Sequence, residues 1–330
     1  MTDTNVSRPA TGGASALSVE AAPRSAAPPV RGDRSRKRDT RDAVLFLAPY
    51  LVIFTVFVLA PLLYGIWVSL HDYDFTLPEA PWVGLENYTG LLTGDSPFAE
   101  TFWQSVQATW LFTALTVPLL LVLPLLVALV LNQKFPGRNL FRALYFAPYV
   151  LGVAVVAVLW RYLLDTNIGL VNHYLGVIGL RDTVPWLTSL PWAWISLVGV
   201  TVWWTLGFNT VIYLAALQDI SPELYEAARV DGANAVQRFR NVTLPGLRPV
   251  VLFITSVTII ASVNMFGQSY LMTAGGPGTE TRTGIYEIAE VGLRQFNTGQ
   301  AAAMSLIFTF FLMVVSLAVF YAFRDRDARR

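Results

Sequence analysis

The chain has 330 residues, of which 54% are hydrophobic and only 14% are charged, and its formal net charge is +1. Soluble domains carry about 25% charged residues, so this composition indicates that a lipid bilayer is the solvent for much of the chain. There is no Cys and there are two His, which excludes disulfides, thiolate catalysis and a convincing zinc site. The near-zero net charge gives no indication of nucleic-acid binding.

The N-terminal segment, residues 1–42, is rich in Ala, Pro, Ser, Thr and Arg and has no apolar periodicity. This composition predicts a disordered tail. The tail ends in a basic run directly before an apolar segment, so a signal peptide is the competing interpretation. A signal peptide has an apolar region of only about 7–15 residues. Residues 43–70 continue without a charge, which favours a retained helix.

Six apolar segments each provide the roughly 20 residues that cross about 30 Å of hydrocarbon. They lie at 43–70, 106–131, 143–164, 194–217, 250–271 and 302–323. We therefore expect an all-α, polytopic membrane protein with a six-helix transmembrane domain over 43–324 and a short C-terminal segment, 325–330.

The distribution of basic residues predicts the orientation. If the N-terminus is cytoplasmic, 19 of the 23 Lys and Arg residues lie in the tail, the two loops on that side and the C-terminus. Cytoplasmic segments carry such an excess. The opposite loop over 71–104 has six acids and no Lys or Arg. We expect both termini in the cytoplasm and an even number of spans.

The spans contain almost no ionisable residue, which disfavours an ion-coupled secondary carrier and a membrane-embedded enzyme. The nearest exception is Arg161, at the end of the third span. It can form an ion pair with Asp165, four residues later. The chain also lacks a G-x-x-x-x-G-K-[ST] phosphate loop. If this protein pumps a solute, a partner chain supplies the energy.

The loop over 219–249 has strong local signals. Ser221 is a good N-cap, Pro222 suits the first helical position, and Gly232 can end a helix in the left-handed conformation. We expect a short helix over 222–231, a second over 233–241, and a turn into the fifth span at Pro245. A ten-residue helix is marginal alone, and this one is acidic rather than basic. A protein partner is therefore favoured over a lipid surface.

The pattern Glu226-Ala227-Ala228, then Gly232, then Leu244-Pro245 resembles the EAA loop of binding-protein-dependent ABC import permeases. In that family the short helix couples the spans to a cytosolic ATPase. The resemblance implies that the ATPase-coupling residues are Leu224, Tyr225, Glu226, Ala227, Ala228, Asp231, Gly232, Leu244 and Pro245.

Segments 46–50, 84–88, 141–148, 271–278 and 299–305 resemble the first-subunit type of the maltose and glycerol-phosphate importer group. The resemblance implies the type I importer fold in a bacterial inner membrane. It also implies a second permease subunit, ATPase subunits that bind ATP and Mg²⁺, and an extracytoplasmic solute-binding protein. No cofactor is expected on this chain. Extra N-terminal spans and a large external domain are lacking, which favours a shorter sugar permease over a maltose-type subunit. Glycerol phosphate or a polyol remains an alternative substrate.

Polar residues at helical spacing in the fourth and fifth spans predict the substrate path. Thr205, Asn209 and Tyr213 are spaced i, i+4, i+8, and Asn264 and Gln268 are spaced i, i+4, so each set is expected on one helix face. Amides there could bond sugar hydroxyls, and ring faces could come from Trp160, Trp203, Trp204 or Tyr270. The same amides could instead join helices to one another, as polar groups in membranes do.

Overall fold

The computed structural model describes residues 33–180 and 183–324, and these form helices and no strand. The predicted all-α class is therefore confirmed for this part of the chain. Residues 1–32 of the tail predicted over 1–42, and the C-terminal residues 325–330, lie outside the described residues. The chain divides into two compact units, residues 1–59 and 60–330.

The first unit contains α1 (Asp33–Phe54), followed by a π-helical turn, η1 (Thr55–Leu59). We predicted that regular structure begins at residue 43, but α1 begins ten residues earlier, at Asp33. The intervening sequence is mostly Lys, Arg and Asp, and Lys and Arg are among the better helix formers. Its helicity is a matter of backbone propensity, which an apolar-periodicity criterion does not detect.

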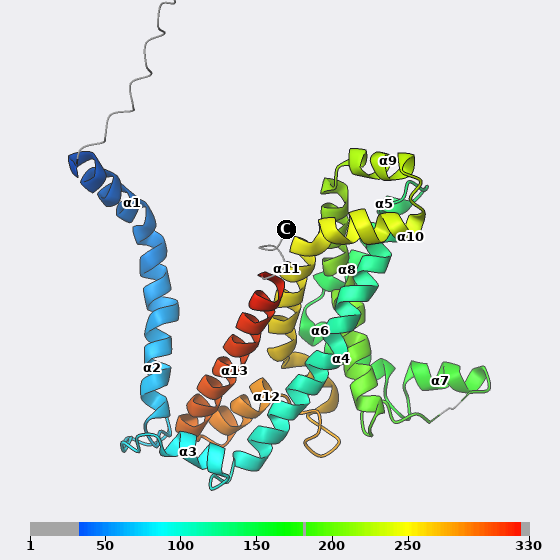
Figure 1. Ribbon diagram of the computed structural model, residues 1–330. Helices are drawn as coiled ribbons and strands as arrows, with labels where there is room; N and C mark the ends of the chain where they lie inside the picture. Colours follow the sequence, from blue (N-terminus) through cyan, green and yellow to red (C-terminus); the bar gives the residue numbers. More distant parts are fainter. Residues whose placement is uncertain (1–32, 181–182, 325–330) are drawn as a thin grey trace, which may run out of the picture. The chain divides into compact units, whose positions relative to one another are not determined.

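The second unit contains the remaining helices (Figure 1). The four long ones are α4 (Ala99–Leu131), α8 (Trp192–Asp219), α11 (Leu244–Val263) and α13 (Thr298–Arg324). The shorter ones are α2 (Ala60–Ser69), α3 (Glu86–Thr93), α5 (Arg138–Val150), α6 (Val153–Leu163), α7 (Leu170–Val177), α9 (Pro222–Val230), α10 (Ala235–Arg238) and α12 (Gly284–Ala289). Three π-helical turns are η2 (Phe239–Thr243), η3 (Ser269–Thr273) and η4 (Glu290–Arg294).

Five segments of the described chain are long and apolar enough to cross a membrane, and a bent helix pair could make a sixth. The five are Val44–Ser69, Ala99–Leu131, Trp192–Asp219, Ala235–Val263 and Thr298–Tyr321. Five of the six expected spans are thus present as continuous segments, and the bent pair corresponds to the remaining one, the third. The third and the fifth are built differently from our prediction.

The predicted third span, 143–164, is not one helix. It is divided between α5 and α6, which are bent by 96°. Leu151 and Gly152 between them are extended. The carbonyl of Leu151, which the break releases from helical bonding, accepts a hydrogen bond from Trp204 Nε1 at 3.0 Å. Such a bond is required because an unpaired backbone group inside a membrane costs several kcal/mol.

The predicted fifth span, 250–271, begins and ends elsewhere. Residues Ala235–Val263 form one continuous helical segment through α10, η2 and α11. We expected Pro245 to turn the chain, but it does not. It occupies the second position of α11, where its missing N–H is tolerated next to the π-helical turn. The helix ends at Val263, eight residues before the predicted end, and the polar Asn264 is its C-cap.

The helix α4 lies at the centre of the second unit and packs against α8, α11 and α12. Phe112 and Leu197 belong to one apolar cluster between α4 and α8, while Phe102 and Met304 belong to another between α4 and α13. Where α5 meets α8, a Cβ on Gly207 would lie 2.1 Å from the carbonyl oxygen of Tyr145. Only glycine allows this backbone approach, which is typical of membrane helix packing.

Candidate functional site

A cavity of about 530 Å³ opens between α4, α8, α11 and the segment that follows α11. Its volume is in the range of small-molecule sites. Four of the six residues that we predicted for the substrate path line it, namely Thr205, Asn209, Asn264 and Gln268. Aromatic rings complete the wall, from Phe112, Tyr149, Trp204, Phe208 and Phe266.

The two polar residues on α8 differ in how they are held. Thr205 Oγ1 donates to the carbonyl of Thr201 in its own helix at 2.8 Å, so its lone pairs remain available to the cavity. Asn209 is buried, and its Nδ2 donates to the carbonyl of Leu120 on α4 at 3.2 Å. The Asn209 Oδ1 makes no hydrogen bond with the described residues. Asn209 therefore joins two helices and also presents an acceptor to the cavity.

Asn264 and Gln268 both line the cavity, but not by the helical spacing that we predicted. The helix α11 ends at Val263, and Asn264 is its C-cap, with Nδ2 donating to the carbonyl of Ile260 at 2.8 Å. Gln268 is buried, and its Nε2 lies 3.3 Å from Thr201 Oγ1 on α8. The chain between them is not regular helix. Gly267 faces α6 closely there, since a Cβ on it would lie 2.7 Å from Val153 Cγ2.

Tyr213 and Tyr270, which we also predicted for the substrate path, do not line this cavity. Tyr213 is fully buried in an apolar cluster with Leu247 and Ile254, because α8 extends beyond the end of the cavity. The Tyr270 hydroxyl accepts a hydrogen bond from Arg294, and its ring packs edge-on against Tyr286. Helical spacing identified the correct face of α8 but not the depth at which the cavity ends.

Sequence reasoning missed Tyr149 and Phe208, whose rings stack in the cavity wall with centroids 4.8 Å apart. Phe208 lies next to Asn209 on α8, while Tyr149 lies near the end of α5. No sequence signal places Tyr149 there, because its position depends on the break between α5 and α6. Trp160 and Trp203, which we considered as ring faces, pack edge-on against each other outside the cavity lining.

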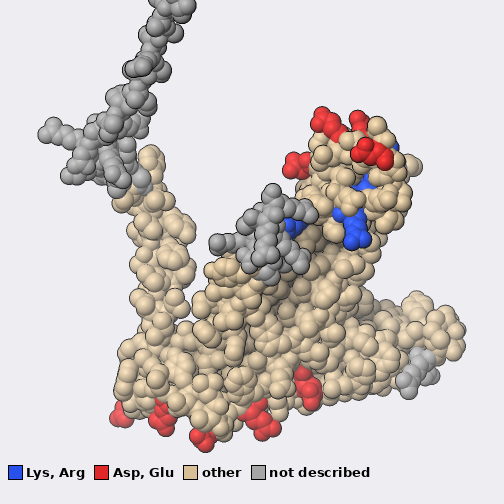
Figure 2. Space-filling model, in the orientation of Figure 1, with Lys and Arg blue, Asp and Glu red and all other residues tan. Residues whose placement is uncertain are grey.

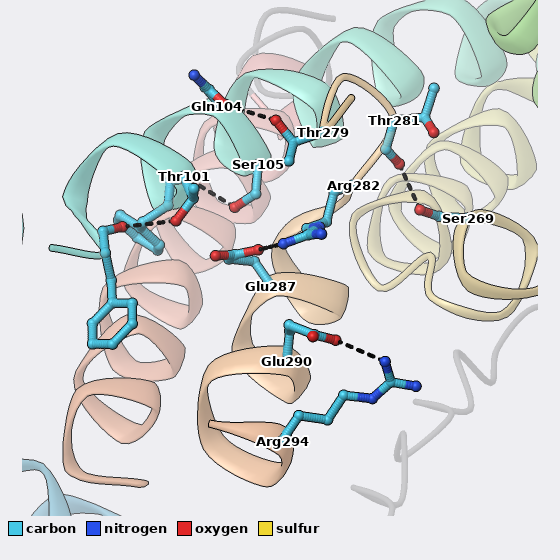
Figure 3. Close-up of polar contacts among 12 residues, drawn as sticks. Thr101, Gln104, Ser105, Ser269, Thr279, Thr281, Arg282, Glu287, Glu290 and Arg294 are labelled. Atoms are coloured by element: carbon cyan, nitrogen blue, oxygen red, sulfur yellow. Dashed lines mark hydrogen bonds and ion pairs between the residues drawn. The ribbon is translucent and has the colours of Figure 1, made fainter. Parts of the chain in front are cut away.

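The segment after α11 is fixed by hydrogen bonds to distant residues (Figure 3). Thr283 Oγ1 donates at 2.5 Å to the carbonyl of Met265, which lines the cavity. The backbone N–H of Gly284 donates to Thr109 Oγ1 on α4 at 2.9 Å. Thr279 Oγ1 donates to Gln104 Oε1, also on α4, at 2.9 Å. These bonds hold the irregular backbone at the cavity against the central helix.

The helix α9 forms as the local signals predict. The Ser221 hydroxyl accepts from the Glu223 N–H at 3.3 Å, and Pro222 occupies the first turn. Gly232 has φ +77°, the left-handed conformation that ends the helix. Asn234 and Gln237 then form a capping box at the start of α10. In Figure 1, α9 lies across one end of the second unit.

The predicted coupling residues lie at three places: on the outer part of α9, around a hollow beside α10, and in the first turn of α11. On α9, Leu224, Glu226 and Ala227 are exposed, whereas Tyr225 is half-buried, with its hydroxyl 3.0 Å from Thr243 Oγ1. Ala228, Asp231 and Gly232 border a hollow of about 350 Å³ beside α10. Leu244 and Pro245 are exposed in the first turn of α11. The loop thus presents small and acidic groups outward from a helix that is itself tied to η2.

Residues 87–330 match the family model described as the binding-protein-dependent transport system inner membrane component. The chain belongs to this family. As a member, it is a multi-pass inner-membrane permease subunit of an ABC importer and is a transport subunit rather than an enzyme.

Relatives in the binding-protein-dependent transport family are similar over nearly the whole chain. A probable ABC transporter permease protein, y4oQ, from Sinorhizobium fredii is 34% identical, with 90% of this chain and 95% of the relative covered. A trehalose/maltose transport system permease protein, MalF, from Thermococcus litoralis is 33% identical, with 86% and 93% covered. A crystal structure of a bacterial alginate ABC transporter, in complex with a periplasmic protein that binds an alginate pentasaccharide, contains a chain with a TM-score of 0.74 and 25% identity. The match covers 87% of this chain and 96% of that one.

Proposed function

We propose that this subunit imports an uncharged carbohydrate and that the cavity between α4 and α8 is its half of the path. The observation that carries this proposal is the chemistry of the wall. Amide and hydroxyl groups of Thr205, Asn209, Asn264 and Gln268 lie there together with aromatic rings, and among the described residues no Asp, Glu, Lys, Arg or His lines the cavity. Amides and hydroxyls bond sugar hydroxyls, and ring faces pack against the apolar faces of sugars.

The uncharged wall also distinguishes between the substrate classes. Glycerol phosphate or an acidic polysaccharide would require cationic partners, because burying an uncompensated anion is costly. The part of the chain that the structure describes contributes no cationic side chain to the cavity. The relatives named for carbohydrate transport, which include a trehalose/maltose permease, support a neutral sugar.

We propose that both termini are cytoplasmic, and that α9 therefore faces the cytosol. The excess of Lys and Arg in the tail, in the loops on the α9 side and at the C-terminus supports this orientation. In Figure 2 the end of the second unit opposite α9 displays acidic residues, whereas both signs of charge appear near α9.

We propose that α9 is the coupling helix and that ATP and Mg²⁺ bind on partner ATPase subunits. The exposed Leu224, Glu226 and Ala227 would contact the ATPase, and the bond from Tyr225 to Thr243 would carry its movement into η2 and α11. A second permease subunit would complete the path, and an extracytoplasmic binding protein would deliver the sugar at the opposite end. ATP binding would open the path outward, and hydrolysis would return it to the inward-facing state.

The coupling proposal is tested by measuring ATP-driven uptake in membrane vesicles with Glu226→Lys. A positive charge on the exposed face of α9 should uncouple the subunits and reduce uptake at least tenfold. Glu79→Lys is the matched control, because Glu79 is equally exposed at the opposite end and should leave uptake within twofold of the wild type. Normal uptake with Glu226→Lys would reject α9 as the coupling helix.

The assembly is tested by affinity purification of the full-length chain from its native membrane in mild detergent. A P-loop ATPase, a second permease and a solute-binding protein should be recovered with it. The recovered binding protein can then be screened against neutral sugars and against glycerol phosphate. Selective binding of glycerol phosphate would reject the proposed substrate class while leaving the coupling mechanism intact.

A further inference from the structure

A second, apolar groove lies where α4 ends and α5 begins, away from the proposed path. Its volume is about 360 Å³, and it is lined by side chains that include Leu126 and Val130 of α4, Phe135 of the connecting loop, and Phe141 and Tyr145 of α5. Val130 is 58% exposed, so the groove opens on the outer surface of the chain. The helix α5, which forms one wall of the groove, lies at the same end of the second unit as α9 (Figure 1).

Basic residues flank this apolar groove. Lys134 directly precedes the groove residue Phe135, and Arg138 lies one helical turn before the groove residue Phe141. Lys134 is exposed and Arg138 is half-buried, and neither forms a hydrogen bond or ion pair with any described residue. No Asp or Glu occurs between residues 101 and 164. The helices and the loop that form the groove therefore carry uncompensated positive charge.

Arg142 fixes the geometry of this region. Its Nη2 donates to the carbonyl of Leu131, the last residue of α4, at 3.0 Å. The bond closes the loop between α4 and α5, and it keeps Phe135 and Phe141 close, with ring centroids 6.0 Å apart. The groove is thus held together by the chain itself.

We propose that the groove binds an anionic phospholipid, with an acyl chain along the apolar wall and the phosphate beside Lys134 and Arg138. Membrane helices bind anionic headgroups at such basic sites next to the hydrocarbon boundary. A lipid fits better than a protein helix for two reasons. The exposed groove side chains of both helices are apolar except for the hydroxyl of Tyr145, as a lipid-facing surface requires. The charge lies only in the loop and in the first turns of α5, next to the hydrocarbon boundary.

The test is native mass spectrometry of the full-length chain, extracted with the subunits that remain bound. The extracted protein is titrated with phosphatidylglycerol or with phosphatidylcholine that has the same acyl chains. Each basic residue near a membrane surface strengthens anionic lipid binding by about fivefold. Lys134→Gln/Arg138→Gln should therefore weaken phosphatidylglycerol binding by about 25-fold and leave phosphatidylcholine binding unchanged. Arg229→Gln/Arg240→Gln removes the same charge at the same end, outside the groove, and should change neither.

Two further measurements separate the acyl chain from the headgroup. Val130→Trp fills the groove and should reduce phosphatidylglycerol binding although both basic residues remain. Inorganic phosphate at millimolar concentration should not displace the lipid. The proposal is overturned if the two double variants weaken phosphatidylglycerol binding equally, if phosphate competes fully, or if Val130→Cys cross-links to a partner subunit in the native membrane.

Discussion

Arg282 and Glu287 form an ion pair with Nη1 and Oε2 3.0 Å apart, and only 2% of the Glu287 side chain is exposed (Figure 3). The pair joins the loop after η3 to the start of α12. The guanidinium of Arg282 also lies over the ring of Tyr286, 5.3 Å from its centroid. Since the same loop holds the backbone at the cavity through Thr283, this ion pair contributes to the shape of the proposed path.

We expect Glu287→Leu to destabilise the protein by about 3 kcal/mol, because it leaves the mostly buried Arg282 without a counter-charge. Glu290→Leu is the control. The side chain of its partner Arg294 is 56% exposed, and Arg294 Nη1 lies 3.5 Å from Glu290 Oε2. Losing that ion pair should therefore cost less than about 1 kcal/mol. Detergent-unfolding curves followed by Trp fluorescence measure both. Equal losses would show that burial does not determine the strength of the first pair.

The glycine at position 207 predicts a second difference in stability. We expect Gly207→Ala to destabilise by about 2 kcal/mol or to prevent folding, because its Cβ would overlap the backbone of α5 at Tyr145. Gly199 lies on the same helix with nothing within 4 Å of an added Cβ. Gly199→Ala should be neutral or stabilise by up to about 1 kcal/mol, through its higher helix propensity. The same unfolding measurement compares them, and a tolerated Gly207→Ala would contradict the close approach of α5 and α8.

The parts of this structure that local sequence determines were predictable. Ser221, Pro222 and Gly232 specify the start and the end of α9 through their own backbone preferences, and the helix forms where they place it. The apolar segments were equally clear, because hydrocarbon thickness fixes their length. Each of these signals lies within a few residues of the structure that it specifies.

The helix breaks were not predictable, because distant residues stabilise them. The break at Leu151 depends on the Trp204 indole, 53 residues away, and the end of α11 depends on Thr283, which bonds the carbonyl of Met265. Hydropathy continues unchanged through the break at Leu151. The cavity therefore contains Asn264 and Gln268 for a reason other than their helical spacing, and it excludes Tyr213 despite the correct spacing on α8.

The proposed path predicts a change in substrate affinity for Thr205→Val. Valine keeps the shape of the side chain but removes the hydroxyl that can bond a sugar, a loss of about 0.5–1.5 kcal/mol. The KM for uptake of the sugar that the binding protein binds should rise about threefold to tenfold. Thr113→Val is the control, since Thr113 makes the same bond to its own helix at 2.8 Å but lies outside the cavity lining. Similar KM values for both variants would exclude Thr205 from the path.

The cap of α9 predicts a change in local order. Ser221→Ala removes the acceptor of the Glu223 N–H and should weaken the helix by about 1 kcal/mol. Hydrogen exchange of the amides in the first turn of α9 should become about fivefold faster, and coupled uptake should decrease. Ser221→Asp restores a capping oxygen and should recover both. If exchange accelerates while uptake is unchanged, the order of this helix does not limit coupling.

The proposed orientation predicts which surfaces can be labelled from outside the cell. The chain has no native Cys, so single cysteines report unambiguously. Val230→Cys lies on α9, where Val230 is 88% exposed, and Leu77→Cys lies in the acidic loop at the opposite end, where Leu77 is 61% exposed. A membrane-impermeant maleimide should label position 77 in intact cells and position 230 only after permeabilisation. This orientation places 19 of the 23 basic residues in the cytoplasm. The reverse labelling pattern would place them outside the cell, and it would reject α9 as the site where a cytosolic ATPase docks.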